Sequence, residues 1–181
     1  MAKLIMWNLM TLDGLFEGKD RDLSWHLDVW GEELERLSID QLKSAGGLLF
    51  GRVTYELMAN HWTSATGEVA DFMNALPKHV FSRTLTRSDW ANTEMYGGDL
   101  PATVERLKRK QPKDIFLFGS ADLAASLMPH GLIDEFRIAL NPIILGGGTP
   151  LFKPDDRRKL KLLDARALAS GIAILRYEPT N

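Results

Sequence analysis

The chain contains no cysteine, which excludes disulfide bonds, zinc–thiolate sites and thiol nucleophiles. It also lacks an apolar run of the roughly 18 residues that a membrane span requires. The start, Met1-Ala2-Lys3-Leu4, leads straight into a predicted strand and has none of the regions of a secretory signal. We therefore expect a cytoplasmic protein without a membrane partner.

A large charge of either sign is also absent. With 22 Lys and Arg against 24 Asp and Glu, the formal net charge is −2, so we expect no nucleic-acid partner. The histidines are scattered without the spacing of metal ligands, and no metal site is predicted: His26, His61, His79 and His130. The 181 residues, 45% of them hydrophobic, fit one domain over 1–181 with a substantial core.

Apolar patterns predict strands that alternate with helices until the end of the chain, where strand follows strand. The predicted strands cover 2–10, 48–50, 78–82, 93–96, 115–118, 133–141, 159–168 and 172–178. Helices are predicted over 28–44, 53–59 and 121–129 and after the N-cap residue Asp99, and the glycines at 146–148 predict a loop. This order predicts an α/β domain with a mainly parallel sheet flanked by helices and antiparallel C-terminal strands.

Three predicted strands end in turns that are suited to phosphate groups. Gly51-Arg52-Val53-Thr54 places a cation at a helix start, although a tight turn with a solvated arginine would look the same. Ser82-Arg83-Thr84 offers hydroxyls and a guanidinium, or is only a surface loop. Gly119-Ser120-Ala121-Asp122 lets a pyrophosphate approach a helix start, unless Asp122 simply complements the helix dipole.

The order of six motifs resembles the dihydrofolate reductase superfamily and, within it, the RibD C-terminal branch, which includes the reductase half of the riboflavin-biosynthesis deaminase-reductase. The first three motifs are Thr11-Leu12-Asp13-Gly14, Leu49 to Glu56 and Val80 to Leu85. The later three are Phe118 to Leu123, Gly131 to Glu135 and Pro142 to Gly146. Together they cover nearly the whole chain.

The resemblance implies NADPH as cofactor and assigns roles by position. It implies that Gly51, Arg52 and Thr54 form the first phosphate turn, and that Ser82 and Arg83 hold the adenosine 2′-phosphate. The pyrophosphate would lie on Gly119, Ser120, Ala121, Asp122 and Leu123, and the nicotinamide would be flanked by Leu9 and Phe16. Trp7, Asn8 and Asp13 would lie near the substrate, with Asp13 as the catalytic residue, although Asp13 could equally be only a turn residue.

The chain also departs from the family pattern. Ser120 replaces the second of two glycines that a cis peptide usually joins, Phe118 replaces an acidic substrate contact of the riboflavin reductase, and Leu15 replaces an arginine. The buried acid of dihydrofolate reductase could be replaced by Glu32, Glu33 or Glu35. The tryptophans at 25, 30, 62 and 90 are expected in the core rather than on pocket walls.

The resulting hypothesis is an NADPH-dependent reductase of a pteridine-like or riboflavin-precursor heterocycle of the 5-amino-6-ribosylaminouracil type. The alternative is a non-catalytic nucleotide- or ligand-binding protein on the same fold. A homodimer is expected because one small domain would not bury all the apolar side chains near the C-terminus, namely Ile138, Leu140, Ile143, Ile144, Leu145, Leu151 and Phe152.

Overall fold

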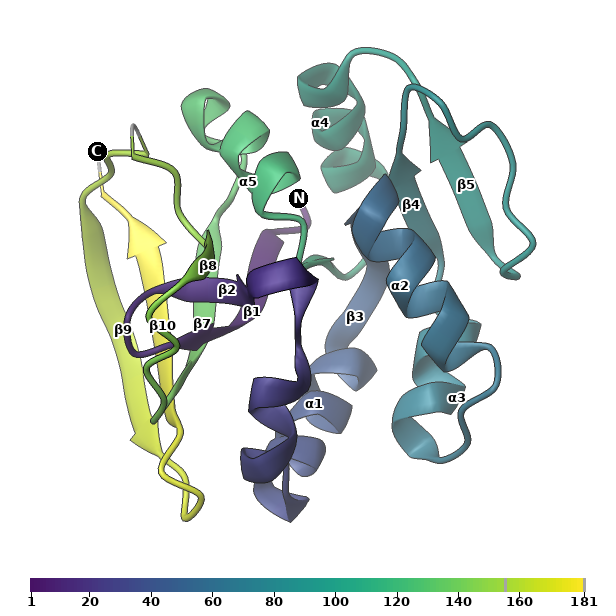
Figure 1. Cartoon of the computed structure of the whole chain (residues 1–181). Coiled ribbons are helices and arrows are strands. Elements are labelled where there is room, and N and C mark those ends of the chain that lie inside the picture. Colours follow the sequence, from purple (N-terminus) through teal and green to yellow (C-terminus); the bar gives the residue numbers. More distant parts are fainter. Residues whose placement is uncertain (155, 181) are drawn as a thin grey trace.

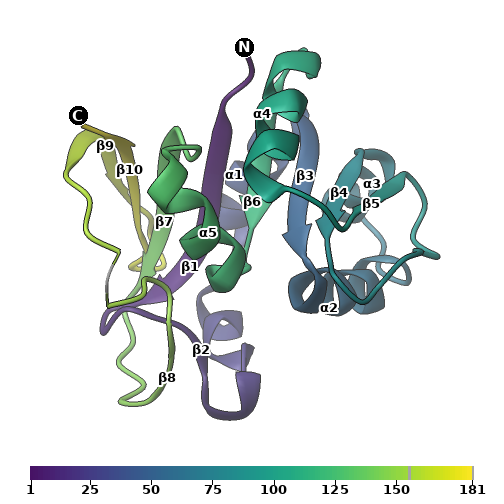
Figure 2. The ribbon, with the colours of Figure 1, turned by 90° about the horizontal axis from the view of Figure 1, so that it is seen from above.

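The computed structural model describes residues 1–154 and 156–180, and over these ranges the chain forms one α/β domain (Figures 1 and 2). The strands are β1 (Leu4–Thr11), β2 (Leu15–Gly18), β3 (Ala45–Gly51), β4 (Lys78–Phe81), β5 (Thr93–Tyr96), β6 (Asp114–Phe118), β7 (Glu135–Asn141), β8 (Gly148–Pro150), β9 (Leu160–Ala167) and β10 (Ala173–Pro179). The α-helices are α1 (Glu32–Ser44), α2 (Arg52–Trp62), α3 (Glu68–Ala75), α4 (Leu100–Lys110) and α5 (Ala121–Leu127). Short 3₁₀ turns are η1 (Lys19–Arg21), η2 (Ser24–Val29) and η3 (Met128–His130).

The main sheet has the order β5-β4-β3-β6-β1-β7-β10-β9. The pairs from β5 to β7 are parallel, and β10 pairs antiparallel with both β7 and β9. The predicted mainly parallel sheet with antiparallel C-terminal strands is thereby confirmed. Because the parallel strands point the same way, the polar turns that follow β1, β3 and β6 emerge at one edge of the sheet.

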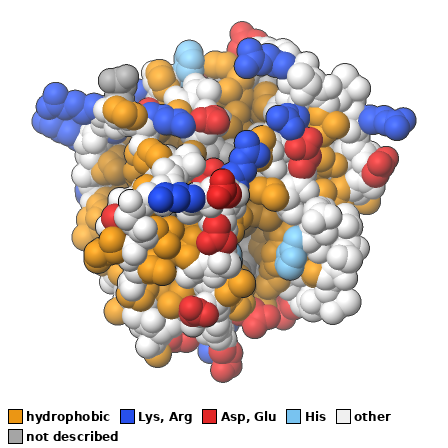
Figure 3. All heavy atoms as spheres, in the orientation of Figure 1, with side chains coloured by type: hydrophobic (Ala, Val, Ile, Leu, Met, Phe, Trp, Pro, Cys, Tyr) orange, Lys and Arg blue, Asp and Glu red, His pale blue; other side chains and the backbone are white. Residues whose placement is uncertain are grey.

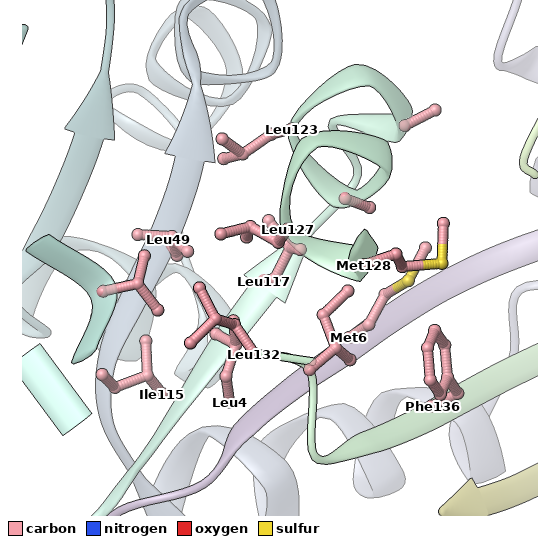
Figure 4. Packing of buried hydrophobic residues seen from close by; sticks show 14 of the residues in the cluster. Leu4, Met6, Leu49, Ile115, Leu117, Leu123, Leu127, Met128, Leu132 and Phe136 are labelled. Atoms are coloured by element: carbon pink, nitrogen blue, oxygen red, sulfur yellow. The ribbon is translucent and has the colours of Figure 1, made fainter. Parts of the chain in front are cut away.

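Helices cover both faces of the sheet, and each face has its own apolar core. Helices α4 and α5 bury side chains against one face, where Leu127 of α5 packs over Leu4, Met6 and Leu117 of the central strands (Figure 4). Helices α1, α2 and α3 cover the opposite face, on which Leu34 packs with Phe50 and Phe116. Strands that are buried on both faces read as continuous apolar runs, which is the pattern that predicted them.

Three short elements differ from the sequence prediction. Helix α3 was not predicted, and neither were β2 and β8. The glycine stretch that predicted a loop runs directly into β8, because Gly148 is the first residue of that strand. Gly148 has φ +150°, and a Cβ atom there would lie 2.1 Å from the carbonyl oxygen of Glu17, so only glycine permits the β2–β8 pairing.

The β2–β8 ribbon folds across the carboxyl edge of the main sheet and carries Phe16 toward the start of α5, where Phe16 lies beside Gly119. Asp99 caps α4 as predicted, and its carboxylate accepts a hydrogen bond from the backbone N–H of Ala102 (3.1 Å). None of the helices in the described ranges is long and apolar enough to cross a membrane.

Candidate functional site

A cleft of about 1510 Å³ lies at the carboxyl ends of β1, β3 and β6. Its walls come from these strand ends, from the β2 segment and η1 and η2 that follow it, and from α1, α2 and the start of α5. Figure 3 shows the corresponding face of the molecule hollowed near its middle, with apolar side chains inside and charged side chains around the hollow. Ligands of open α/β sheets bind at such a position.

The turns before α2 and α5 are tied together by hydroxyl groups. The Ser120 hydroxyl accepts a hydrogen bond from the backbone N–H of Gly51 (2.8 Å) and donates one to the Thr54 hydroxyl (2.8 Å). The Thr54 hydroxyl also accepts the backbone N–H of Ser120 (3.0 Å). Two of the predicted phosphate turns are therefore one rigid unit, although they are far apart in the sequence.

Gly119 and Ser120 both adopt left-handed backbone conformations, with φ +55° and +56°. A Cβ at position 119 would lie 3.0 Å from the Thr54 methyl group and 3.2 Å from the Phe16 ring, so the turn has room only for glycine. The described residues contain no cis peptide bond, so the chain makes this turn with two left-handed residues and a trans bond.

Charged groups flank both helix starts. Arg52, in the first turn of α2, pairs with Glu56 one turn later (2.8 Å), and both side chains are about half exposed. Asp122, in the first turn of α5, pairs with Lys153 (2.7 Å) while 94% of its side-chain surface stays exposed. Arg52, Asp122 and Lys153 all line the cleft, so cations remain beside the backbone N–H groups of both helix starts.

Of the remaining predicted cofactor residues, Ala121 and Leu123 are buried in α5 beside the turn and also line the cleft. Ser82 and Arg83 directly follow β4, whose last residue Phe81 is the register partner of Gly51. The structure thus brings the Ser82-Arg83 loop next to the Gly51-Arg52 turn, although the lining of the cleft itself does not include the loop.

Two residues predicted near the substrate, Trp7 and Asn8, and two predicted to flank the nicotinamide, Leu9 and Phe16, meet at the cleft beside the middle of β1. Trp7, Asn8 and Leu9 all line the cleft, and the side chains of Trp7 and Asn8 are buried. Phe16 of the β2–β8 ribbon also lines it. These four residues come from β1 and β2, and the tertiary fold brings them next to the predicted phosphate turns that follow β3 and β6.

Part of the cleft was missed by sequence reasoning. Trp25, His26 and Trp30 of the η2 region line it, as does Trp62 at the end of α2. Three of the tryptophans expected in the core are therefore cleft walls, whereas Trp90 is buried in the core.

Burial lowers the pKa of His26, and a backbone hydrogen bond with Leu23 and the charge of Asp22 oppose this only in part. His26 is consequently neutral near pH 7.

The acidic residues at the start of α1 do not supply a buried acid. Glu32 pairs with Arg36 on the exposed side, and the Glu33 carboxylate accepts the backbone N–H of Ala169 (2.6 Å). Glu35 reaches the cleft, but only as an exposed residue at its mouth. The buried positions of α1 that line the cleft are instead the neutral residues Ser38, Gln41 and Leu42.

Asp13 lies outside the cleft lining, in the turn between β1 and β2. Its carboxylate accepts a hydrogen bond from the Thr11 hydroxyl (2.6 Å) and from the backbone N–H groups of Gly146 (2.9 Å) and Leu145 (3.4 Å). These contacts join the turn to the segment before β8. The geometry therefore favours the turn role over the catalytic role that the resemblance implied.

The fold defines a class, namely a single-domain protein with a reductase-type, dihydrofolate reductase-like architecture. The family model described as the RibD C-terminal domain matches residues 2–174. The chain belongs to this family.

Among the relatives, the uncharacterized protein YyaP of Bacillus subtilis (strain 168) is 31% identical, over 97% of this chain and 94% of its own length. A Shewanella sp. PV-4 protein with a provisional riboflavin-biosynthesis name superimposes with a TM-score of 0.82 at 21% identity, over 100% of both chains. Dihydrofolate reductase from Enterococcus faecalis, solved with NADP(H), gives 0.66 at 11% identity, over 99% of this chain and 97% of that one. At such low identities the two structures establish the fold alone.

We expect Asp13→Asn to lower the melting temperature at pH 7 and to leave cofactor affinity unchanged. The hydrogen bonds, chiefly from the Thr11 hydroxyl and then from Gly146, lower the pKa of Asp13. The folded-state pKa is therefore below the unfolded value of about 3.9, so the stabilisation is present above that pH and is lost as the pH falls through the folded pKa. Melting curves of both proteins from pH 7 down to pH 3 should converge at the acid end.

The control for Asp13→Asn is Asp40→Asn, an exposed carboxylate on α1 away from the turn. A difference between Asp13→Asn and the wild type that persists unchanged at pH 3, or an unaltered melting temperature at pH 7, would contradict the turn role.

We expect Ser120→Ala to destabilise the protein by about 1–3 kcal/mol, because it leaves the Gly51 N–H without its acceptor in a buried turn. For a chain of this length the loss corresponds to a melting temperature lower by roughly 2–10 °C. Ser126→Ala is the matched control, since Ser126 is an exposed serine of the same helix whose hydroxyl bonds only to the Asp122 carbonyl. Equal melting temperatures for the two variants would show that the tie between the turns contributes nothing.

Proposed function

We propose that this protein is an NADPH-dependent reductase of a planar heterocycle, pteridine-like or a riboflavin precursor. The proposal rests chiefly on two helix starts, Gly51-Arg52 and Gly119-Ser120, which hydrogen bonds hold together on one wall of the cleft. Aromatic side chains form the other wall. Membership of the RibD C-terminal family supports a reductase-type activity. The NADP(H) in the related fold of the Enterococcus faecalis enzyme supports this choice of cofactor.

The residues present fit a dinucleotide in this position. Because Gly119 has no side chain, Thr54 and Phe16 can pack against this turn, and the starts of α2 and α5 lie together beside the cleft. The first-turn N–H groups of α2 and α5 have no intrahelical partners and attract phosphate oxygens. In the proposal Arg52 holds one phosphate, Ser82 and Arg83 hold the 2′-phosphate, and the start of α5 from Ala121 to Leu123 supports the pyrophosphate.

When bound, NADPH supplies a hydride from its nicotinamide ring. The protein's own contribution is to orient two flat rings against each other and to keep water away from them. Leu9 and Phe16 are apolar and partly buried, and in the proposal they lie on either side of the nicotinamide. Trp7 and Asn8, in the middle of β1, then lie near the substrate on opposite faces of the strand.

We expect the protein to bind NADPH about tenfold to a hundredfold more tightly than NADH, because a charge-assisted contact to the additional phosphate contributes about 1.5–3 kcal/mol. Arg83→Ala should remove most of this preference and leave NADH affinity unchanged. Isothermal titration calorimetry with both cofactors measures these affinities.

The matched control for Arg83→Ala is Arg87→Ala, an exposed arginine four residues further along the same loop. Equal affinities for the two cofactors in the wild type, or equal effects of the two arginine variants, would refute the phosphate assignment. NADPH binding without oxidation by any of a panel of pterins and pyrimidines would favour the non-catalytic binding protein.

We also propose that the protein pairs as a homodimer through β9. Ile138 and Leu151, which the sequence offered as interface residues, are buried within the chain, whereas Ile144 is 69% exposed. The exposed apolar side chains on the edge strand β9 are Leu160, Leu162 and Leu163, and Leu162 is 51% exposed. An edge strand has unpaired backbone N–H and C=O groups, and exposed leucines add an apolar surface, so a second copy of the chain can pair with it.

We expect light scattering to give twice the mass of the chain, and Leu162→Lys to give the mass of a single chain, because a buried lysine at the interface would be unpaired. Leu57→Lys, which changes an exposed leucine of α2, is the control and should remain dimeric. A wild-type protein that keeps the single-chain mass up to high concentration would rule out the dimer.

A further inference from the structure

Four buried side-chain polar atoms in the described part of the chain have no hydrogen-bond partner, and three of them belong to residues of the cleft. These three are the amide nitrogens of Asn8 and Gln41 and the indole nitrogen of Trp25. The residues are only 2%, 5% and 7% exposed, respectively. All three atoms are hydrogen-bond donors, and an unpaired buried donor is unfavourable unless something in the site accepts from it.

The orientation of the Gln41 amide follows from the group next to it. Its oxygen accepts a hydrogen bond from the guanidinium of Arg137 (3.2 Å), and a guanidinium can only donate. Arg137 is itself fixed, because its Nε bonds to the buried carboxylate of Glu135 (2.6 Å) and its guanidinium lies 5.3 Å from the centre of the Phe116 ring. The NH₂ group of Gln41 therefore points away from Arg137.

The Trp25 indole leaves no choice of orientation either, because its nitrogen is a donor only. Four acidic residues of the described ranges line the cleft, and none of them accepts a hydrogen bond from these donors: Glu17, Asp20, Glu35 and Asp122. Glu35 and Asp20 are exposed, and the Glu17 carboxylate accepts a hydrogen bond from the Thr149 hydroxyl (2.9 Å). Buried donors inside the cleft and acids only at its mouth select for a ligand that presents acceptors to the interior.

We propose that the side of the cleft formed by α1, η2 and β1 binds a flat, uncharged ring whose buried edge carries carbonyl oxygens or unprotonated ring nitrogens. The Gln41 and Trp25 nitrogens donate to that edge, whereas the Asn8 side chain lies on the opposite face of β1, beside Ile138. Rings that present amino groups or an amidinium to the same atoms meet donors and are rejected. The inference rests on the proposed function only in taking this ligand to be the substrate.

The test uses two compounds with the same bicyclic pteridine ring system and different groups on the pyrimidine edge. In 1,3-dimethylpteridine-2,4-dione the ring edge carries acceptors only, whereas in pteridine-2,4-diamine it carries two amino groups. Titration calorimetry should show the dione binding about tenfold more tightly than the diamine, or better. Tighter or equal binding of the diamine, or no binding of either ring, would overturn the proposal.

Two variants then assign the preference to particular atoms. Trp25→Phe keeps an aromatic wall and removes the N–H together with part of the indole, and Gln41→Glu keeps the oxygen on Arg137 and replaces the donor by an acceptor. Each should weaken dione binding by about tenfold, and Gln41→Glu should also strengthen diamine binding. Asn60→Asp adds the same charge as Gln41→Glu on the exposed side of α2, outside the cleft, and should change neither affinity. Unchanged affinity ratios in both cleft variants, with normal melting curves, would mean that the donors serve only water.

Titrations with and without NADPH separate this inference from the proposed function. A preference for the dione in a protein that does not bind NADPH would refute the reductase and leave the acceptor-edge site standing. NADPH binding and turnover of both kinds of ring, without any preference for the dione, would support the reductase and refute the acceptor-edge site.

Discussion

The arrangement of the cleft depends on the contact between the Ser120 and Thr54 hydroxyls. Thr54 lies in the first turn of α2 and Ser120 directly precedes α5, and these helices follow the neighbouring strands β3 and β6. The Ser120 hydroxyl also accepts the Gly51 N–H. With both helix starts fixed, Gly119 can keep its left-handed conformation against Phe16 of the β2–β8 ribbon. Loss of this contact would remove the hydrogen bonds that join the starts of α2 and α5 on one wall of the cleft.

The two ends of the cleft are stabilised by different interactions. Around α2 and α5 the hydroxyl groups bond to one another, so this wall is rigid. The groups that remain available to a ligand there are backbone N–H groups and cationic side chains. Around α1 the chain leaves the donors of Gln41 and Trp25 unpaired, although burial makes unpaired donors unfavourable. Unpaired polar groups that persist inside a cleft are more readily understood as ligand contacts than as packing errors.

The motifs at strand ends could be predicted because their local chemistry is strong. Glycines and hydroxyls after apolar runs identified the turns at 51–54 and 119–122, and the turns occupy the edge that a parallel sheet gives them. Helix α3 and the strands β2 and β8 could not be found in this way. Strands β2 and β8 are four and three residues long, and β2 exists only because β8 pairs with it from across the chain.

The sequence alone thus determined the alternation of strands and helices and the chemistry of each turn, because both depend on residues close together in the chain. The tertiary structure decided which side chains face the cleft. The packing of Leu34 and Leu42 fixes the rotation of α1, which buries Gln41 in the cleft, leaves Glu35 exposed at its mouth and keeps Glu32 and Glu33 out of its lining. The tertiary structure also makes cleft walls of the tryptophans at 25, 30 and 62, which local patterns cannot distinguish from core residues, because a cleft wall and a core share one apolar composition.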